Sequence, residues 1–460
     1  MSAQNWKKLM SLAVIVVSFN ALARDEYPAA PASDPRTPQL RQIYPFRPLS
    51  TDEVHSRVNR MTEDARALKN IHEIDARGLS SANSRQQPWA GSFWPLIQGQ
   101  IGNAYHDKTV LDPQALLSWR ENVRDFKKKR EEKLSRPYEL SERELRRLAP
   151  SEKYDLLLGD TNFDLTNRIW SFVETYGNGK QWAFLSSIDM PPGFRLPVPN
   201  DNMALWEGIC HGWALAAGGS DRPLNTVEFT LPNGKKLPFL PTDVKALISL
   251  MYANSVVQDN VLMEGIRCDN KKPNQDQFGR YIDTVPVAPS ESVLPRCADV
   301  HPAVWYLSLV NLTGIQGRAL VAEIDANATV NNHPFSGYEV IYFNPETGRE
   351  GPLARSILAL EQFRRPDVYA ASRNPETRSI VGVEMKMKYI DWTWPKEDAT
   401  DAEDKDKVKK RKMLFDLELD AQGNIIGGQW RAEKDPRTFN KEAGSEGTNQ
   451  PDFLWTLPRN

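Results

Sequence analysis

Hydrophobic positions in the first half of the chain recur with a helical period. Residues 51–77 place apolar side chains at helical spacing, namely Val54, Val58, Met61 and Leu68. Residues 113–149 are highly charged and are predicted as an exposed helical stretch. A further helix is expected to begin with Thr242 as its N-cap, because apolar residues follow it at the spacing i, i+3, i+4 and i+7.

In the second half the apolar period shifts to two, which is typical of strands. We expect strands over 303–312, 318–324, 337–343 and 379–392, with a hairpin over 413–430 that turns at Gln422-Gly423. The charged run 398–412 is predicted as an exposed linker or hairpin loop. Together these patterns predict an α+β fold in which a helical N-terminal half packs on an antiparallel sheet.

The N-terminal residues have the pattern of a secretory signal peptide. Lys7 and Lys8 precede the apolar run 9–19, and Ala21-Leu22-Ala23 provides small residues for cleavage. The run is shorter than the roughly 20 residues of a membrane anchor, so we expect residues 1–23 to be removed and the protein to be secreted or periplasmic. Residues 24–84 are interpreted as a pro-segment or dispensable helical extension, the alternative being that they belong to the helical domain.

The composition of the chain argues against some classes of binding partner. The chain of 460 residues holds 58 basic and 60 acidic residues, with a net charge of −2, and proteins that bind nucleic acid usually carry a net basic field. We therefore expect no nucleic-acid partner and, with no other apolar span, no stable membrane insertion. No His, Cys or Asp cluster has metal-ligand spacing, so neither metal nor cofactor is expected.

The chain has three cysteines: Cys210, Cys268 and Cys297. In an oxidising compartment paired cysteines tend to be bridged, and an odd one is a possible reactive thiol. Cys268 and Cys297 bracket a proline-containing stretch without helical or strand period, so a disulfide between them would close a long loop. This pairing leaves Cys210 reduced.

Cys210 has a sequence context suited to nucleophilic chemistry. Gly208 and Gly212 flank it closely, and an Ala-rich helical segment follows. A cysteine at a helix N-terminus lies at the positive end of the helix dipole, which favours the thiolate. The glycines would let a substrate carbonyl approach the backbone N–H groups. The alternative is a buried structural cysteine on a core helix.

Four blocks carry a resemblance to a known family. They are PWAGSFWPLIQGQIGNAY (88–105), WEGICHGWALAA (206–217), the run from CADVHPAVWYLSLVNLTG to ATVNNHPFSGYEV (297–340), and LELDAQGNIIGGQW with PDFLWTLP (417–430, 451–458). The chain resembles the transglutaminase elicitor family of secreted, calcium-independent cysteine acyltransferases from oomycetes and bacteria. The resemblance implies a catalytic region over 85–460 with Cys210 as the nucleophile.

A thiol nucleophile needs a base, which in papain-like and transglutaminase sites comes from a later sheet. We predict His301 as the base, because it stands at the start of the expected strand 303–312. This gives a papain- or transglutaminase-like site with the cysteine on a helix and the histidine on a strand. His211 is expected to shape the site, and His333 to be a surface residue of the elicitor-like loop.

The orienting carboxylate is expected from the neighbouring strand. Asp325 is preferred over Glu323 and Asp299, since Glu323 and Asp325 share one strand face. The chain has Tyr306 where the family segment carries a histidine. An incomplete triad would favour a different function, a secreted interaction protein of weak activity.

The predicted reaction transfers the acyl group of a protein glutamine to a lysine or another amine through a thioester at Cys210. Asn202 and the Cys210 backbone N–H are expected to bind the oxyanion, and Trp206 and Trp213 to line a groove that excludes water. A papain-like peptidase or amidase, in which water takes the thioester, uses the same residues.

Overall fold

The computed structural model describes most of the chain after residue 47. The described residues are 48–106, 128, 130–177, 207–256, 261–265, 284–285, 294–295, 300–323, 331–364, 367, 369–431, 451 and 453–456. All of them lie in one compact unit, Pro45–Asn460.

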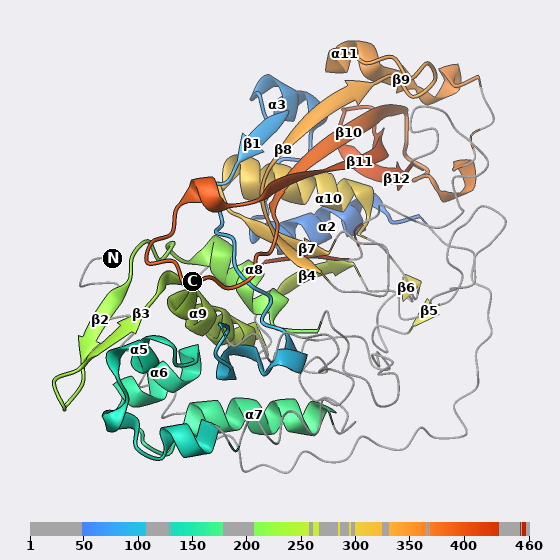
Figure 1. The fold of residues 1–460 in the computed structure, drawn as a ribbon. Helices are drawn as coiled ribbons and strands as arrows, with labels where there is room; N and C mark the ends of the chain where they lie inside the picture. The colour runs from blue at the N-terminus through green and yellow to red at the C-terminus, as the bar shows by residue number, and fades with distance from the viewer. Residues whose placement is uncertain are drawn as a thin grey trace, which may run out of the picture. The chain divides into compact units, whose positions relative to one another are not determined.

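An antiparallel sheet is the central element of this unit (Figure 1). Its strands follow the order β12-β11-β10-β8-β7-β13-β4, with β1 added to β8 and β9 added to β10. Their bounds are β1 Ser81–Asn83, β4 Leu262–Gly265, β7 Leu320–Glu323, β8 Asn332–Phe343, β9 Ile357–Ala359, β10 Ser379–Ile390, β11 Val408–Leu419, β12 Ile425–Trp430 and β13 Phe453–Thr456. Two small hairpins stand apart from it: β2 Val227–Thr230 with β3 Lys236–Phe239, and β5 Thr284–Val285 with β6 Leu294–Pro295.

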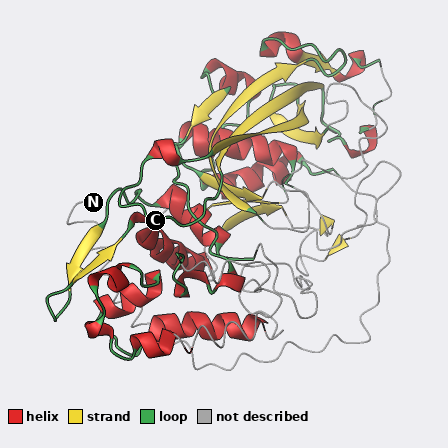
Figure 2. Cartoon of the chain, viewed as in Figure 1, coloured by secondary structure: helices red, strands yellow, loops and turns green. Residues whose placement is uncertain are grey.

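The structure combines helices with strands, in agreement with the predicted α+β class (Figure 2), and most of the helices come from the first half of the chain. They are α2 Thr51–Thr62, α3 Ile71–Ala76, α5 Glu142–Arg146, α6 Pro150–Leu157, α7 Asp164–Gly177, α8 Cys210–Gly219, α9 Pro241–Val256, α10 Pro302–Leu309 and α11 Leu353–Ser356. Among the described residues, no helix is both long and apolar enough to cross a membrane.

Helix α2 belongs to the main hydrophobic core. Ser50 and Glu53 form a capping box at its start. Val54, Val58 and Met61 then point inward and are fully buried against α10 and one face of the sheet, as their spacing predicts. The described part of the predicted extension 24–84 therefore contributes side chains to the core that also holds the sheet. Whether the extension is dispensable stays a prediction.

The prediction of a strand over 303–312 is wrong. These residues form α10 and the first turn of a π-helix, η7 Val310–Ile315. Every residue of α10 is buried, because the helix is enclosed by α2, β11 and β12. A segment that is apolar on all sides has no period that separates a buried helix from a buried strand. Tyr306 consequently lies in the core, where its hydroxyl contacts that of Tyr342 at 2.8 Å.

The remaining strand predictions agree with the structure in most respects. β8 and β10 cover the predicted segments, and the hairpin of β11 and β12 turns at Gly423, whose φ of 83° suits glycine. β11 begins at Val408, however, so the last residues of the charged run 398–412 form a strand and not a loop. α9 begins at Pro241, so Thr242 lies inside the helix it was expected to cap.

Helix α8 covers the other face of β7 and β13. Ala214 and Leu215 pack there against Val321, Phe453 and Trp455. α9 packs closely on the back of α8 at Gly212, where an added Cβ would lie 2.2 Å from the Ser249 carbonyl oxygen. α8 is thereby held between the sheet and α9.

Candidate active site

Cys210 is the first residue of α8, in agreement with the prediction that it lies at a helix N-terminus. The preceding backbone is fixed by a short antiparallel pairing: Ile209 N–H donates to the Phe93 carbonyl at 2.7 Å, and Leu96 N–H donates to that of Glu207 at 2.8 Å. An added Cβ at Gly208 would lie 2.2 Å from the Phe93 oxygen, so the approach requires glycine. Cys210 carries a reduced thiol and is partly exposed.

Side chains from three neighbouring strands lie on the face of the sheet that α8 covers. Glu323 on β7 stands directly opposite Asn332 on β8 and Phe453 on β13, so the three side chains share the face that α8 covers. The Asn332 side-chain N–H group donates to Cys210 Sγ at 3.4 Å. The Asn332 side-chain oxygen in turn accepts from Trp455 Nε1 at 3.0 Å.

The electrostatic state of the thiol differs from the prediction. Burial raises the pKa of Cys210, the hydrogen bonds from Asn332 lower it, and the negative field of Glu323 raises it further. The net direction is upward, opposite to the lowering expected from the helix N-terminus, and burial of the thiol is its largest cause.

His211 follows the nucleophile on α8. Its side chain is buried, and burial lowers its pKa to about 4. The imidazole is therefore neutral near neutral pH, and its role in shaping the site stays a prediction.

His301 does not lie on a strand, which corrects the expected histidine-on-strand geometry. It is the residue before α10, with Pro302 in the first helical position. Burial and the charge of Arg57 lower its pKa to about 3, and its Nδ1 has no hydrogen-bond partner in the described part of the chain. α10 packs in the core with Ala322 and Leu454, whereas α8 packs on the opposite face of the same strands. The helices that begin at His301 and Cys210 therefore cover opposite faces of the sheet.

Five residues of the predicted site fall outside the described residues: Asn202, Trp206, Cys268, Cys297 and Asp325. Their roles, and the disulfide between Cys268 and Cys297, stay predictions. Glu323, the second choice for the carboxylate, does lie at the site. Trp213 is only 1% exposed and donates its indole N–H to the Trp89 carbonyl at 3.2 Å, so it is part of the core and does not line an open groove.

Sequence reasoning missed Asn332 and Trp455. Both lie in blocks that carry the family resemblance, VNNHPFSGY and PDFLWTLP, which was the available signal. The neighbouring His333 is buried and not a surface residue as predicted. Its Nδ1 lies 3.2 Å from the Ile390 carbonyl oxygen, and its ring contacts Trp213 and Tyr389.

An aromatic cluster borders the nucleophile segment. Phe93, whose carbonyl binds Ile209, packs edge to face on Trp392 with ring centroids 5.1 Å apart, and Trp392 packs in the same way on Trp394. The Trp394 side chain is 46% exposed. The cluster therefore presents one accessible aromatic side chain, Trp394, and is joined to the segment before Cys210 through Phe93.

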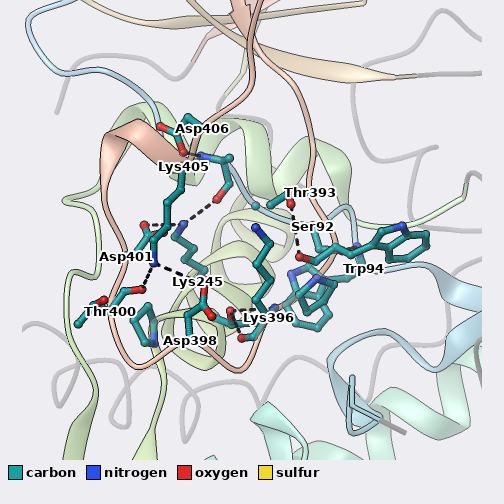
Figure 3. Close-up of a pocket in the computed structure, with 16 residues that line it drawn as sticks. Ser92, Trp94, Lys245, Thr393, Lys396, Asp398, Thr400, Asp401, Lys405 and Asp406 are labelled. Atoms are coloured by element: carbon teal, nitrogen blue, oxygen red, sulfur yellow. Dashed lines mark hydrogen bonds and ion pairs between the residues drawn. The ribbon is translucent and has the colours of Figure 1, made fainter. Parts of the chain in front are cut away.

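A pocket shares Trp394 with the aromatic cluster and is also lined by residues such as Trp94, Lys245 and Asp401 (Figure 3). The buried Lys245 ammonium binds Asp401 at 2.8 Å and the Ala90 carbonyl at 2.7 Å. Arg222 also binds Asp401, at 3.0 Å. Cys210 is not among the lining residues, and the two charges named there, Lys245 and Asp401, are paired with each other.

In the described part of the chain, no group of three or more His, Cys, Asp or Glu side chains is arranged to hold a metal ion. That the protein binds no metal stays a prediction.

Comparison with known proteins identifies the family. A sequence profile described as Transglutaminase elicitor matches residues 201–459, which is more than half of the chain. The chain belongs to the transglutaminase elicitor family. The matched region contains Cys210, Asn332, which binds its sulfur, Trp455, which binds Asn332, and Glu323, which stands opposite Asn332 in the sheet.

A solved structure supports the fold of this elicitor-family chain. It is similar to the crystal structure of the GP42 transglutaminase from Phytophthora sojae, with a TM-score of 0.50 and 17% sequence identity over 88% of this chain and 90% of that one. At this identity the likeness shows the mixed helix and antiparallel-sheet fold. A comparison with curated proteins finds no match.

Proposed function

We propose that the protein is a secreted cysteine acyltransferase of the protein-glutamine γ-glutamyltransferase type. The observation that carries the proposal is the Cys210 thiol at the start of α8 with the Asn332 amide donating to its sulfur. Membership of the transglutaminase elicitor family and the transglutaminase-like fold support it. The predicted signal peptide at residues 1–23 accounts for secretion.

In the proposed reaction Cys210 Sγ attacks the side-chain carbonyl carbon of a protein glutamine. The thiol proton leaves through the Glu323 carboxylate and is passed to the departing nitrogen, so that ammonia is released and a thioester remains. A lysine amine then attacks the thioester, gives up a proton and regenerates the thiol. The Asn332 N–H group is placed to stabilise negative charge at the sulfur or at the oxygen beside it.

Glu323 replaces His301 as our choice of base. Its negative charge raises the pKa of the thiol, and its partner in the ladder is Asn332. His301 lies before α10 and has a lowered pKa. Asn202 keeps its predicted role as oxyanion donor. Asp325 was expected to orient the His301 ring, so with Glu323 as the base we assign it no step. For the substrate surface we propose Trp206 together with the exposed Trp394.

The decisive experiment follows both products in the wild-type protein. A glutamine peptide and a fluorescent primary amine should yield peptide–amine conjugate and one equivalent of ammonia, and mass spectrometry of quenched samples should find the acyl group on Cys210. Conversion of glutamine to glutamate without conjugate would indicate an amidase instead. Cleavage of the peptide backbone would indicate a peptidase.

Replacing Glu323 by Gln should have two opposite effects. Because the Glu323 field raises the thiol pKa, the midpoint of Cys210 alkylation against pH should fall. Acyl transfer should nevertheless slow by about a hundredfold, a typical loss for a general base. The Glu384→Gln variant, which removes a carboxylate from β10, is the control. A lower alkylation midpoint with unchanged transfer would leave Glu323 an electrostatic role and refute its role as base.

One observation favours a second function. A raised thiol pKa is unusual for a reactive cysteine, and it would suit a secreted interaction protein that retains the fold with little activity. Absence of acyl-enzyme on Cys210 with every amine and peptide tested would favour this alternative.

A further inference from the structure

The chain ends, among the described residues, with a strand inside the sheet. β13 pairs with β7 on one side and β4 on the other, and Trp455 at its centre is 2% exposed. Its indole reaches across to β8, where Nε1 lies 3.0 Å from the Asn332 side-chain oxygen. This hydrogen bond joins two residues more than 120 positions apart in the sequence, directly beside the Cys210 thiol.

This contact decides which end of the Asn332 amide faces the sulfur. An indole N–H can only donate a hydrogen bond, so its partner must be the amide oxygen. The NH₂ end must then point the other way, toward Cys210 Sγ at 3.4 Å. Without the indole, either end of the amide could face the sulfur.

We propose that Trp455 is a positioning residue for Cys210, and that its indole N–H holds the Asn332 amide as a hydrogen-bond donor to the sulfur. We call the two consecutive hydrogen bonds, from Trp455 to Asn332 and from Asn332 to Cys210, the relay. Through the relay, the strand β13 contributes to the site. The catalytic role of this relay rests on the proposed function, whereas the test measures only the ionisation of the Cys210 thiol.

The direction of the effect follows from hydrogen-bond chemistry. A donor stabilises a thiolate, while an acceptor stabilises the protonated thiol. If the amide turns over, its oxygen faces the sulfur and the thiolate loses its donor. The same loss would affect the negative charge that develops when Cys210 attacks a carbonyl.

The test is the pH profile of Cys210 alkylation by iodoacetamide, quantified on the Cys210 peptide by mass spectrometry. The Trp455→Phe variant should shift the alkylation midpoint upward by about one pH unit, since a hydrogen bond to a charged group is worth that much. The Asn332→Leu variant should give an equal or larger upward shift. In the double variant, Trp455→Phe should add nothing, because its effect acts through Asn332.

The matched control is Trp430→Phe. It removes the same kind of bond, from Trp430 Nε1 to the Val300 carbonyl at 2.8 Å, at the other end of the sheet, and should leave the midpoint unchanged. If Trp455→Phe does not fold, benzothienylalanine at position 455 keeps the ring shape and replaces the N–H by sulfur. A folded variant with an unshifted midpoint, or an equal shift in the Asn332→Leu background, would overturn the proposal. A shifted midpoint in a protein without transfer activity would refute the proposed function and leave the relay standing.

Discussion

Replacing Cys210 by Ala is expected to reduce acyl transfer by at least about a thousandfold, because removal of a covalent nucleophile leaves only binding and oxyanion stabilisation. The protein should stay folded, since the side chain is small and partly exposed. The measurement is conjugate formation between a glutamine peptide and a primary amine, with circular dichroism to check the fold.

Cys210→Ser is the companion variant. Its hydroxyl can still accept the Asn332 hydrogen bond, so the packing at the start of α8 is retained. It should be nearly as inactive, because a hydroxyl is a much weaker nucleophile without strong activation. Transfer above a tenth of the wild-type rate in either variant would show that another residue performs the reaction.

Replacing Val58 by Asp is expected to destabilise the whole fold by at least about 4 kcal/mol, since it buries an unpaired carboxylate. Val58 is fully buried between α2, α10 and the sheet. The thermal unfolding midpoint should fall by roughly 5 °C or more, or the cooperative transition should be lost. Circular dichroism against temperature measures either outcome.

Ser56→Asp provides the matched control, because it adds the same charge to the exposed side of the same helix and should leave the midpoint almost unchanged. The comparison also tests the interpretation of residues 24–84 as a dispensable extension. A Val58→Asp protein that melts like the wild type would show that α2 can be lost without loss of the core.

Local patterns in the sequence were sufficient for the elements with one exposed and one buried face. The spacing of Val54, Val58 and Met61 predicts α2, and the turn at Gly423 predicts the last hairpin. The prediction failed for 303–312, where every side chain of α10 is buried and the period disappears. Because 303–312 was expected to be a strand, His301 was expected at the start of that strand, and its predicted role as base depended on this position.

The sequence alone predicts the site only where the residues that form it are neighbours along the chain. Cys210 could be found from its flanking glycines and the helix that follows. Glu323, Asn332 and Trp455 lie on three different strands, and their meeting depends on the register of β7 against β8 and β13. A one-residue change of register would turn each side chain to the opposite face, so no single segment of sequence contains this information.

The place of β13 between β7 and β4 has a consequence for the order of folding. Among the described strands, β4 pairs only with β13, and both partners of β13 lie more than a hundred residues earlier in the sequence. Contacts between distant residues carry a high loop-closure cost and form slowly, so we expect this part of the sheet to form late. The hydrogen bond from Trp455 to Asn332 beside the Cys210 sulfur would then be completed only in the last stage of folding.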